Sequence, residues 1–298
     1  MANDIGWELY RSFLAVLREG SLSGAARALG LTQPTVGRHI AALEARLGLA
    51  LFTRSQTGLL PTDAALALRG DAEAMHNTAA ALERTARGLG DGVRGAVRVS
   101  ASEVVGVEVL PPLLAALRRQ HPLLEVELVL SNRLQDLVQR EVDIAVRMAP
   151  PSQDVLVATQ VGEVVVGLHA HRSYIARFGQ PASMAELSRH TVIGYDVETP
   201  FVRAARAKLP AWTHEAFHLR CDSDLGQLAL VRAGAGIGAC QVGLARRDPQ
   251  LVRVLPDRFA FKLPTWVAMH EGLRHNARCR VVFDALVKGM RRYTGAAA

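Results

Sequence analysis

The chain has 298 residues, of which 49% are hydrophobic and 21% are charged, so it is long enough for two or three compact units and too apolar for a disordered protein. Its net charge of +7 does not by itself indicate a nucleic-acid partner, because residues 1–92 hold nine arginines and nine acidic residues and the whole excess lies in residues 93–298. Three widely separated cysteines exclude a disulfide framework and fit a reducing compartment, with a redox pair of Cys221 and Cys240 as the alternative.

The N-terminal residues predict two helices before position 30. The apolar residues of the first helix recur at helical spacing: Ile5, Leu9, Phe13 and Val16. Ser21 or Ser23 can cap a second helix that ends at Leu29, and small alanines on its inner face allow a close approach of the next helix. Gly30 then supplies a tight turn. This pattern is typical of the first part of a helix-turn-helix.

A third helix follows the turn, and its first residues are those that could read DNA. Its apolar residues form one stripe: Val36, Ile40, Leu43 and Leu47. Thr32 is a suitable N-cap, and Pro34 lies in the first turn, where the missing N–H has no cost. Gln33, Thr35 and Arg38 then remain free for a partner. Gln and Arg form paired hydrogen bonds with adenine and guanine, and Thr35 and the helix N–H groups suit phosphate oxygens.

A short β-wing is expected directly after this helix. The run Leu51-Phe52-Thr53-Arg54 is strand-like, turns through Thr57-Gly58 and returns at Leu59-Leu60. The wing would carry Arg54 toward the DNA backbone or the minor groove. Between residues 20 and 60 the arginines outnumber the single acidic residue, Glu44, by three, so DNA binding depends on the placement of a few arginines.

The segment from the N-terminus through the wing resembles the winged helix-turn-helix of LysR-type transcriptional regulators. The matching residues have the family's spacing: Phe13, Val16, Gly20-Ser21, Ala25-Ala26, Leu29, Gln33-Pro34, Arg38, Ile40, Leu43-Glu44, Leu47-Gly48, Leu51-Phe52 and Arg54. The resemblance implies base or groove contacts from Gln33, Pro34, Arg38 and Arg54 and a phosphate contact from Thr35, beside the cap Thr32. Two positions depart from the family pattern: Gly37 replaces the usual serine, and Ala65 replaces the usual glycine.

A long uninterrupted helix is predicted from Pro61-Thr62 to Arg87. Its apolar residues alternate three and four apart in a heptad seam: Ala65, Leu68, Ala72, Met75, Ala79, Leu82, Ala86 and Leu89. A helix of roughly 40 Å has no evident local core to cover this seam, so we expect it to pair with the same helix of a second chain. Packing against its own domain is the alternative. The glycines after Arg87 (Gly88, Gly90, Gly92 and Gly95) predict a hinge.

Beyond the hinge, strands alternate with helices, which implies mainly parallel sheets. The expected strands contain Val97 and Val99, Val126 to Leu130, Asp143 to Val146, Val164 to His169, Val192 to Tyr195, Val252-Leu255 and Trp266-His270. The expected helices span Leu110 to Leu117, opened by Pro111-Pro112, then Leu134 to Val138, Leu225 to Ala233 and Cys279 to Met290. The glycine run from Gly234 to Gly238 fits a helix C-cap followed by a strand.

This half resembles the effector domain of the same regulators, which is built like a periplasmic binding protein. The resemblance rests on Val97-Arg98-Val99, Leu110-Pro111, His121-Pro122, Asp143-Ile144-Ala145 and the run Val231 to Gly238. The expected fold class is thus α+β and multi-domain. A winged helix-turn-helix (1–61) is followed by a linker helix and hinge (62–92) and a two-lobed α/β effector domain (93–298). We expect lobe one at 95–168 plus 270–298 and lobe two at 169–269.

In this family small molecules bind between the two lobes. The resemblance implies effector contacts after the first strands of lobe one and from facing residues of lobe two: Ser100, Ser102, Asn132 and Arg147, with Phe201, Asp222, Ser223 and Gln241 opposite. Arg147 and helix N-termini favour a carboxylate or a similar anion. Glu103 and Asp222 favour an amino group, so an amino-acid-like zwitterion is the second effector class.

We therefore expect a transcriptional regulator that binds double-stranded DNA and a small effector. By resemblance it is a homodimer through the linker helix and a homotetramer. There is no apolar run of about 18 residues and no signal-peptide pattern, so we expect a cytoplasmic protein without membrane contact. The ten histidines show no metal-ligand spacing, and we expect neither a metal nor a cofactor. An enzyme is the first rival, but the chain lacks G-x-S-x-G, P-loop and H-E-x-x-H motifs. A solute-binding protein is the second.

Overall fold

The computed structural model describes residues 5–55, 58–87, 93–132, 142–151, 156–198, 202–203 and 213–296. The chain divides into two compact units, one built by Met1–Ala86 and the other by Arg87–Leu137 together with Val142–Ala298. Three expected features lie outside the described residues: the wing residue Thr57, the hinge residues 88–92 with Leu89, and the helix from Leu134 to Val138.

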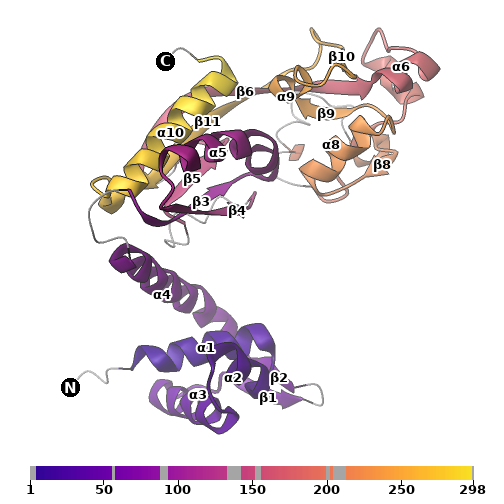
Figure 1. The fold of residues 1–298 in the computed structure, drawn as a ribbon. Helices are drawn as coiled ribbons and strands as arrows, with labels where there is room; N and C mark the ends of the chain where they lie inside the picture. Colours follow the sequence, from indigo (N-terminus) through magenta and orange to yellow (C-terminus); the bar gives the residue numbers. More distant parts are fainter. Residues whose placement is uncertain are drawn as a thin grey trace. The chain divides into compact units, whose positions relative to one another are not determined.

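The first unit contains the predicted winged helix-turn-helix and the long helix (Figure 1). Its elements are α1 (Trp7–Glu19), α2 (Leu22–Leu29), α3 (Gln33–Leu47), β1 (Phe52–Ser55), β2 (Gly58–Pro61) and α4 (Asp63–Arg87). Ser21 caps α2, because its side chain accepts the N–H of Gly24 at 3.1 Å. Gly20, Gly30 and Gly48 end α1, α2 and α3 in the left-handed conformation that favours glycine. The local signals in this part of the chain therefore decide where each helix begins and ends.

The core of this unit also covers the first part of the heptad seam. Phe13, Val36 and Leu43 lie at its centre, and Ala65 and Ala72 of α4 are buried in the same cluster. The expectation that no local core covers the seam is therefore wrong for its first turns. Further along α4 the apolar side chains are exposed: Met75 by 43% and Leu82 by 70%. Among the described seam residues, Met75 and Leu82 are therefore the large apolar side chains that remain exposed.

The second unit is built on a seven-stranded sheet with the order β10-β6-β11-β5-β3-β4, in which β9 also pairs with β6. Its strands are β3 (Gly95–Ala101), β4 (Leu124–Leu130), β5 (Ile144–Arg147), β6 (Leu156–His171), β9 (Gly238–Gln241), β10 (Leu251–Val254) and β11 (Phe261–His270). Strands β4, β3 and β5 are parallel, whereas β11, β6, β9 and β10 are joined by antiparallel pairs. The expectation of mainly parallel sheets is therefore wrong for this sheet. A two-stranded parallel sheet of β7 (Ile193–Gly194) and β8 (Leu219–Arg220) completes the strands.

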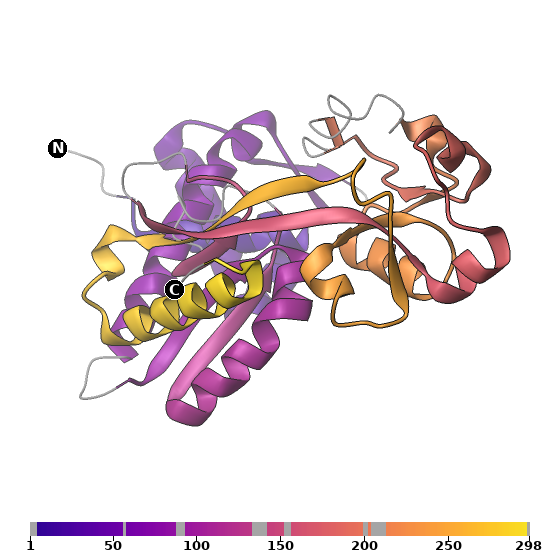
Figure 2. The ribbon, with the colours of Figure 1, turned by 90° about the horizontal axis from the view of Figure 1, so that it is seen from above.

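Two long strands connect the two halves of this unit. Strands β6 and β11 run side by side along it (Figure 2), and β6 is much longer than the expected strand from Val164 to His169. Their register shifts between Pro264 and Trp266, and Gly162 has a positive φ on the facing strand. We call the half that holds β3, β4 and β5 lobe one, and the half that holds β7 to β10 lobe two. The two lobes are thus joined by the paired strands β6 and β11, whose ladder is interrupted at this shift.

The helices of the second unit lie mostly where the periodicity predicts them. They are α5 (Leu110–Gln120), α6 (Arg172–Phe178), α8 (Asp224–Arg232), α9 (Val242–Ala245) and α10 (Ala277–Thr294), with short 3-10 turns η3 (Ala185–Arg189), η4 (His214–Ala216) and η5 (Glu271–Leu273). Pro111 and Pro112 lie in the first turn of α5, as predicted, but the helical segment begins earlier than expected. The chain is already helical at Glu103 and passes through a π-helical turn, η1 (Val105–Val109), before α5.

A buried histidine in β6 gives the fold a pH dependence. His169 is 1% exposed, and its Nδ1 donates to the carbonyl of Gly167 at 3.0 Å. Burial lowers its pKa from 6.5 to about 4. Between these two pH values the unfolded chain binds a proton that the folded protein excludes, so stability falls as the pH drops from about 6.5 to about 4 and then levels off.

We expect this histidine to cost roughly 2 kcal/mol of unfolding free energy between pH 7 and pH 5. Urea unfolding at both pH values, on the native chain and on His169→Asn, measures it. The asparagine keeps an N–H donor toward Gly167 but does not titrate, so the difference between the two chains isolates this group from the other histidines. An identical pH dependence in both chains would contradict the assignment.

Candidate functional site

The start of α3 presents the predicted DNA-contacting side chains to solvent. Gln33, Pro34 and Arg38 are exposed, and Thr35 is half-buried. Thr32 accepts the N–H of Thr35 at 3.4 Å, as expected of the N-cap. The two threonine hydroxyls are 2.8 Å apart, and Arg38 Nη2 donates to Thr35 Oγ1 at 3.5 Å. The three side chains therefore form a hydrogen-bonded row along one face of the helix.

The opposite side of α3 is fixed to the core of its unit. Val36, Ile40 and Leu43 are buried there, and His39 Nδ1 lies 2.7 Å from the hydroxyl of Ser12 on α1. A Cβ atom at Gly37 would lie 3.7 Å from Leu22, an ordinary contact, so nothing in this unit requires glycine at that position. The helix is thus held on one face and free on the other, which is the arrangement a groove-reading helix needs.

The wing is held against the end of α1 and of α3. Arg54 of β1 is exposed and pairs with Leu59 of β2. The N–H of Leu59 donates to the carbonyl of Gly20 at 2.8 Å, and a Cβ atom on Gly58 would meet that carbonyl oxygen at 2.5 Å. Only glycine at position 58 allows this close approach. Arg54 is therefore carried on an anchored hairpin.

Glu44 sets the position of the wing relative to α3. Its Oε1 accepts the N–H groups of Leu51 at 2.7 Å and of Phe52 at 3.2 Å, so one carboxylate connects α3 to the first wing strand. We expect Glu44→Ala to lower the unfolding free energy by about 1–3 kcal/mol, because two backbone donors lose a charged acceptor. Loss of the wing position should also weaken DNA binding. Glu44→Gln keeps one acceptor oxygen, so its unfolding free energy should lie between those of the native chain and Glu44→Ala. Equal unfolding free energies of the three chains in urea would contradict this role of Glu44.

A second group of predicted residues lies at the carboxyl ends of β3, β4 and β5, where parallel strands place ligand sites. Arg147, which is 8% exposed, donates to the hydroxyl of Ser100 at 2.6 Å and to the carbonyl of Val146 at 3.0 Å. The Ser102 hydroxyl is buried without a hydrogen-bond partner among the described residues. Asn132 follows β4 and is exposed. The topology therefore brings all four lobe-one residues to one edge of the sheet.

The N-terminus of α8 in lobe two meets this edge. Ser223 caps α8 through the N–H of Gly226 and donates to Glu103 Oε2 at 3.0 Å. Asn132 accepts the N–H of Glu103 at 3.2 Å and donates to Asp224 at 3.3 Å. Two of the predicted residues, one from each lobe, thus belong to one hydrogen-bonded group, and Glu103 and Asp224 complete it.

Asp224 and its neighbour Tyr195 were not predicted from the sequence as residues of this group. The Tyr195 hydroxyl donates to Asp224. Burial and the neighbouring carboxylate of Asp224 raise the pKa of Tyr195, and burial also raises the pKa of Asp224. Asp224 could have been noticed in the sequence, because it directly follows the N-cap Ser223. An acidic residue in the first turn of a helix, however, usually only stabilises the helix through its dipole.

The remaining predicted effector residues have different surroundings. Gln241 is 8% exposed, and its Oε1 accepts the hydroxyl of Tyr293 on α10 at 2.6 Å. Asp222 is exposed and accepts the N–H groups of Asp196 and Val197 at 2.9 Å each. Phe201 lies outside the described residues. Asp222 therefore shapes a loop of lobe two, and Gln241 is already engaged with α10.

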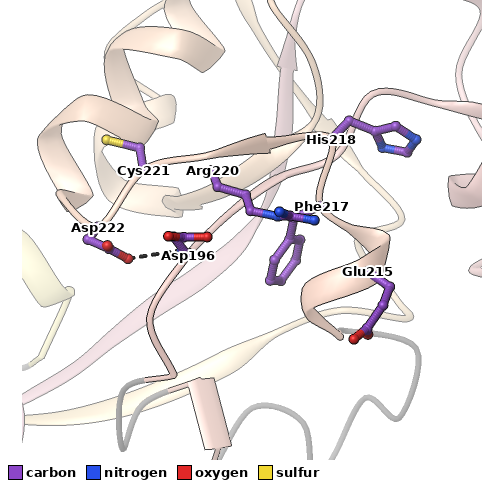
Figure 3. A pocket seen from close by; sticks show the side chains of 7 residues that line it. All are labelled: Asp196, Glu215, Phe217, His218, Arg220, Cys221 and Asp222. Carbon is purple, nitrogen blue, oxygen red and sulfur yellow. Dashed lines mark hydrogen bonds between the residues drawn. The ribbon is translucent and has the colours of Figure 1, made fainter.

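An open hollow of lobe two lies beside Asp222 (Figure 3). It combines three carboxylates with a guanidinium, an imidazole and a thiol, and its lining residues are Asp196, Glu215, Phe217, His218, Arg220, Cys221 and Asp222. His214 Nε2 lies 3.0 Å from Asp196. Among the described residues no group of three or more His, Cys, Asp or Glu side chains could hold a metal ion.

Comparisons with known proteins assign the two halves of the chain. The family model of bacterial regulatory helix-turn-helix proteins of the lysR family matches residues 7–66. The model of the LysR substrate binding domain matches residues 90–291, which is more than half of the chain. The chain belongs to the LysR family of transcriptional regulators. Its α3 is the second helix of the helix-turn-helix, and its two-lobed unit is the substrate-binding domain of the family.

Individual relatives agree with this assignment. The regulator CrgA of Neisseria meningitidis serogroup C is 28% identical over 284 residues, 93% of this chain and 94% of the relative. CbbR of Sinorhizobium medicae is 36% identical over 186 residues, 61% of this chain and 57% of the relative. The match to a regulator of Xanthomonas campestris, 30% identical, spans 61% of this chain and about half, 53%, of the relative.

Solved structures show the same fold. CrgA from Neisseria meningitidis has a TM-score of 0.58 at 24% identity and covers 97% of this chain and 99% of its own. Full-length CbnR, solved as a complex with its target DNA, has a TM-score of 0.66 at 22% identity, with the same coverage of both chains. Within the described ranges of this LysR-type regulator, no helix is long and apolar enough to cross a membrane.

Proposed function

We propose that this regulator recognises operator DNA by inserting the start of α3 into the major groove. The observation that carries the proposal is the hydrogen-bonded row of the exposed Thr32 and Arg38 with the half-buried Thr35 between them. The exposed Gln33 lies beside this row, and the opposite face of the helix is buried. Gln33 and Arg38 would bond base edges, Thr35 would bond phosphate, and Arg54 on the wing would reach the backbone or the minor groove. CbnR, which has the same fold, was solved with its target DNA.

The active form would be a dimer held by α4, and by resemblance a tetramer. The exposed Met75 and Leu82 on the second part of α4 support pairing with the same helix of another chain. Two paired units could then bind two half-sites of a near-palindromic operator.

We infer further that the effector is a small amino-acid-like zwitterion bound between the lobes. At the lobe-one edge lie the guanidinium of Arg147 and the hydroxyl of Ser102, which has no hydrogen-bond partner among the residues that the structure describes. We infer that both would contact a bound carboxylate. Glu103 of lobe one and Asp224 of lobe two place two carboxyl groups at the same junction. Burial raises the pKa of Asp224, and a bound ammonium group would favour its charged form. A simple carboxylate without an amino group is the second candidate, because it needs only the contacts with Arg147 and Ser102.

A thermal-shift screen on the full chain separates these ligand classes. We expect an amino acid to raise the unfolding temperature more than its decarboxylated amine or its deaminated acid at equal concentration. Asp224→Asn should reduce the shift by the amino acid but not that by the acid, and Asp257→Asn, an exposed aspartate of lobe two, is the matched control. A larger shift by the acid would favour the carboxylate class, and no shift by any compound would contradict the zwitterion assignment.

Arg147 tests the location of the pocket. Arg147→Ala should abolish the ligand-induced shift and leave operator binding intact, because the residue belongs to the second unit and the DNA-reading helix to the first. A normal ligand response in this variant would show that the pocket lies elsewhere.

A DNA-binding experiment distinguishes a regulator from the two alternative classes, an enzyme and a solute-binding protein. Either would show no sequence-specific, salt-dependent retention of DNA from the region upstream of its gene, whereas a regulator should lose affinity steeply as salt rises. Effector binding could change the free energy of DNA binding by no more than the difference between its binding free energies for the two arrangements of the lobes.

A further inference from the structure

The π-helical turn before α5 follows from two consecutive prolines. Pro111 and Pro112 have no N–H groups, so in a regular α-helix the carbonyls of Val107 and Glu108 would lack their partners. The helix instead widens, and the N–H of Leu110 bonds the carbonyl of Val105, five residues back. The proline pair therefore leaves the carbonyl of Glu108 available to a donor from outside its helix.

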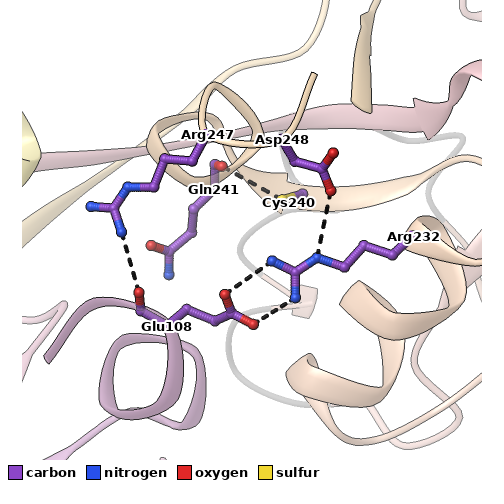
Figure 4. Close-up of polar contacts among 6 residues, drawn as sticks. All are labelled: Glu108, Arg232, Cys240, Gln241, Arg247 and Asp248. Atoms are coloured by element: carbon purple, nitrogen blue, oxygen red, sulfur yellow. Dashed lines mark hydrogen bonds and ion pairs between the residues drawn. The ribbon is translucent and has the colours of Figure 1, made fainter. Parts of the chain in front are cut away.

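Lobe two supplies that donor. Arg247, which follows α9, donates through Nη1 to the carbonyl of Glu108 at 3.2 Å (Figure 4). The Arg247 guanidinium also lies over the ring of Tyr293, 5.1 Å from its centre. A backbone acceptor created by the prolines of lobe one is thus satisfied by a side chain of lobe two.

The side chain of Glu108 makes a second, stronger contact with lobe two. Its two carboxylate oxygens accept from Arg232 Nη1 at 2.6 Å and Nη2 at 2.9 Å, a bidentate pair at the C-terminal end of α8. Asp248 lies 3.9 Å from Arg232 Nε and helps to orient the guanidinium. The hydrogen bond from Arg232 holds the pKa of Glu108 below its ordinary value, so the pair is charged at neutral pH.

Two glutamates of this segment, Glu103 and Glu108, contact α8. Five residues along a regular α-helix differ by roughly 140° in direction, so Glu103 and Glu108 would point to different sides. Glu103 precedes the π turn and Glu108 lies in it, so the wider turn changes the relative direction of these two residues from that of a regular α-helix. Glu103 contacts Ser223 at the N-terminal end of α8, and Glu108 contacts Arg232 at its C-terminal end.

We propose that Glu108, Arg232 and Arg247 form a clasp that holds the two lobes at the angle seen in this structure, and that the proline-induced π turn builds it. Only its consequence for the effector response rests on the function proposed above. The clasp lies at the end of α8 opposite to the effector group of Ser223 and Asp224, so an effector can act on one end of the helix while the clasp restrains the other.

The test measures the distance between the lobes in the full chain. Spin labels are placed at Arg119→Cys on α5 and Asp257→Cys after β10, both exposed, in a Cys221→Ser background, since Cys240 and Cys279 are buried. Labelled chains are diluted with unlabelled chains so that only distances within one chain are seen. No DNA or effector is added, so the outcome does not depend on the proposed function.

We expect Glu108→Gln, and separately Arg247→Met, to shift the distance distribution toward longer or broader separations. The ratio of displaced to clasped forms should change on the order of five-fold, the upper range for an exposed ion pair. Glu127→Gln is the matched control, because it removes a 3.2 Å ion pair with Arg98 that joins two strands within lobe one. It should leave the distribution unchanged.

A double variant with the charges of Glu108 and Arg232 exchanged distinguishes loss of the clasp from local unfolding of the π turn. Glu108→Arg combined with Arg232→Glu should return the distribution toward that of the native chain. If it does not, the effect of Glu108→Gln belongs to local folding and the proposal fails. A native distribution in Glu108→Gln, or an equal change in Glu127→Gln, would overturn it as well.

Discussion

Arg38→Ala should weaken binding to the operator by about one to two orders of magnitude and relax the preference at one base pair. The guanidinium is exposed at the start of α3 and hydrogen-bonded to Thr35, so it is oriented before DNA arrives. A bidentate contact between arginine and guanine contributes about 1–3 kcal/mol of discrimination. Fluorescence anisotropy with operator duplexes substituted at each position measures both effects.

The control for this substitution is another exposed arginine of the same unit. Arg69 on α4 is exposed and pairs with Glu73 of its own helix at 3.0 Å. Arg69→Ala should change the affinity for DNA little and the base preference not at all. Unchanged affinity and unchanged base preference in Arg38→Ala would refute its role as a base-reading residue. A uniform loss over all sequences would instead assign Arg38 to phosphate contact.

Leu82→Glu should disrupt the proposed α4 dimer and lower operator affinity by more than ten-fold. Leu82 is 70% exposed on the second part of the α4 seam, and it lies outside the core cluster formed by the described residues of its unit. A carboxylate in an a/d seam would face its symmetry mate in a helix pair and lose its hydration there. Loss of the dimer separates the two reading heads, so each half-site would be bound alone.

Leu66→Glu is the matched control for the seam. Leu66 is also an exposed leucine of α4, at 50%, but it lies outside the heptad seam. Sedimentation velocity should show a monomer for Leu82→Glu and an unchanged assembly for Leu66→Glu. A Leu82→Glu chain that still sediments as the native assembly would mean that α4 does not hold the dimer.

The N-terminal unit could be predicted almost element by element, because its signals are local. The N-caps Ser21 and Thr32 and the left-handed glycines Gly30 and Gly48 set the helix boundaries, and each acts within one turn of the helix it ends. The exposed and buried faces of α3 followed from the spacing of its apolar residues.

The second unit was less predictable because its features depend on contacts distant in the sequence. The antiparallel pairing of β6 with β11 joins residues about one hundred positions apart, so no short spacing of apolar residues predicts it. The pairing of Gln241 with Tyr293 and of Tyr195 with Asp224 joins elements separated by tens of residues. The proline pair at 111–112 was visible in the sequence, but it suggested a helix start, whereas the preceding residues widen into a π turn.

Footprinting of the purified chain on DNA upstream of its gene tests most directly whether α3 occupies the duplex groove. We expect two protected half-sites separated by roughly 10 base pairs or a multiple of that, with protection that weakens as salt rises and disappears in a Gln33→Ala, Arg38→Ala double variant. No protected operator at any ionic strength, or equal protection by the native chain and the double variant, would contradict the assignment of α3 as the reading helix.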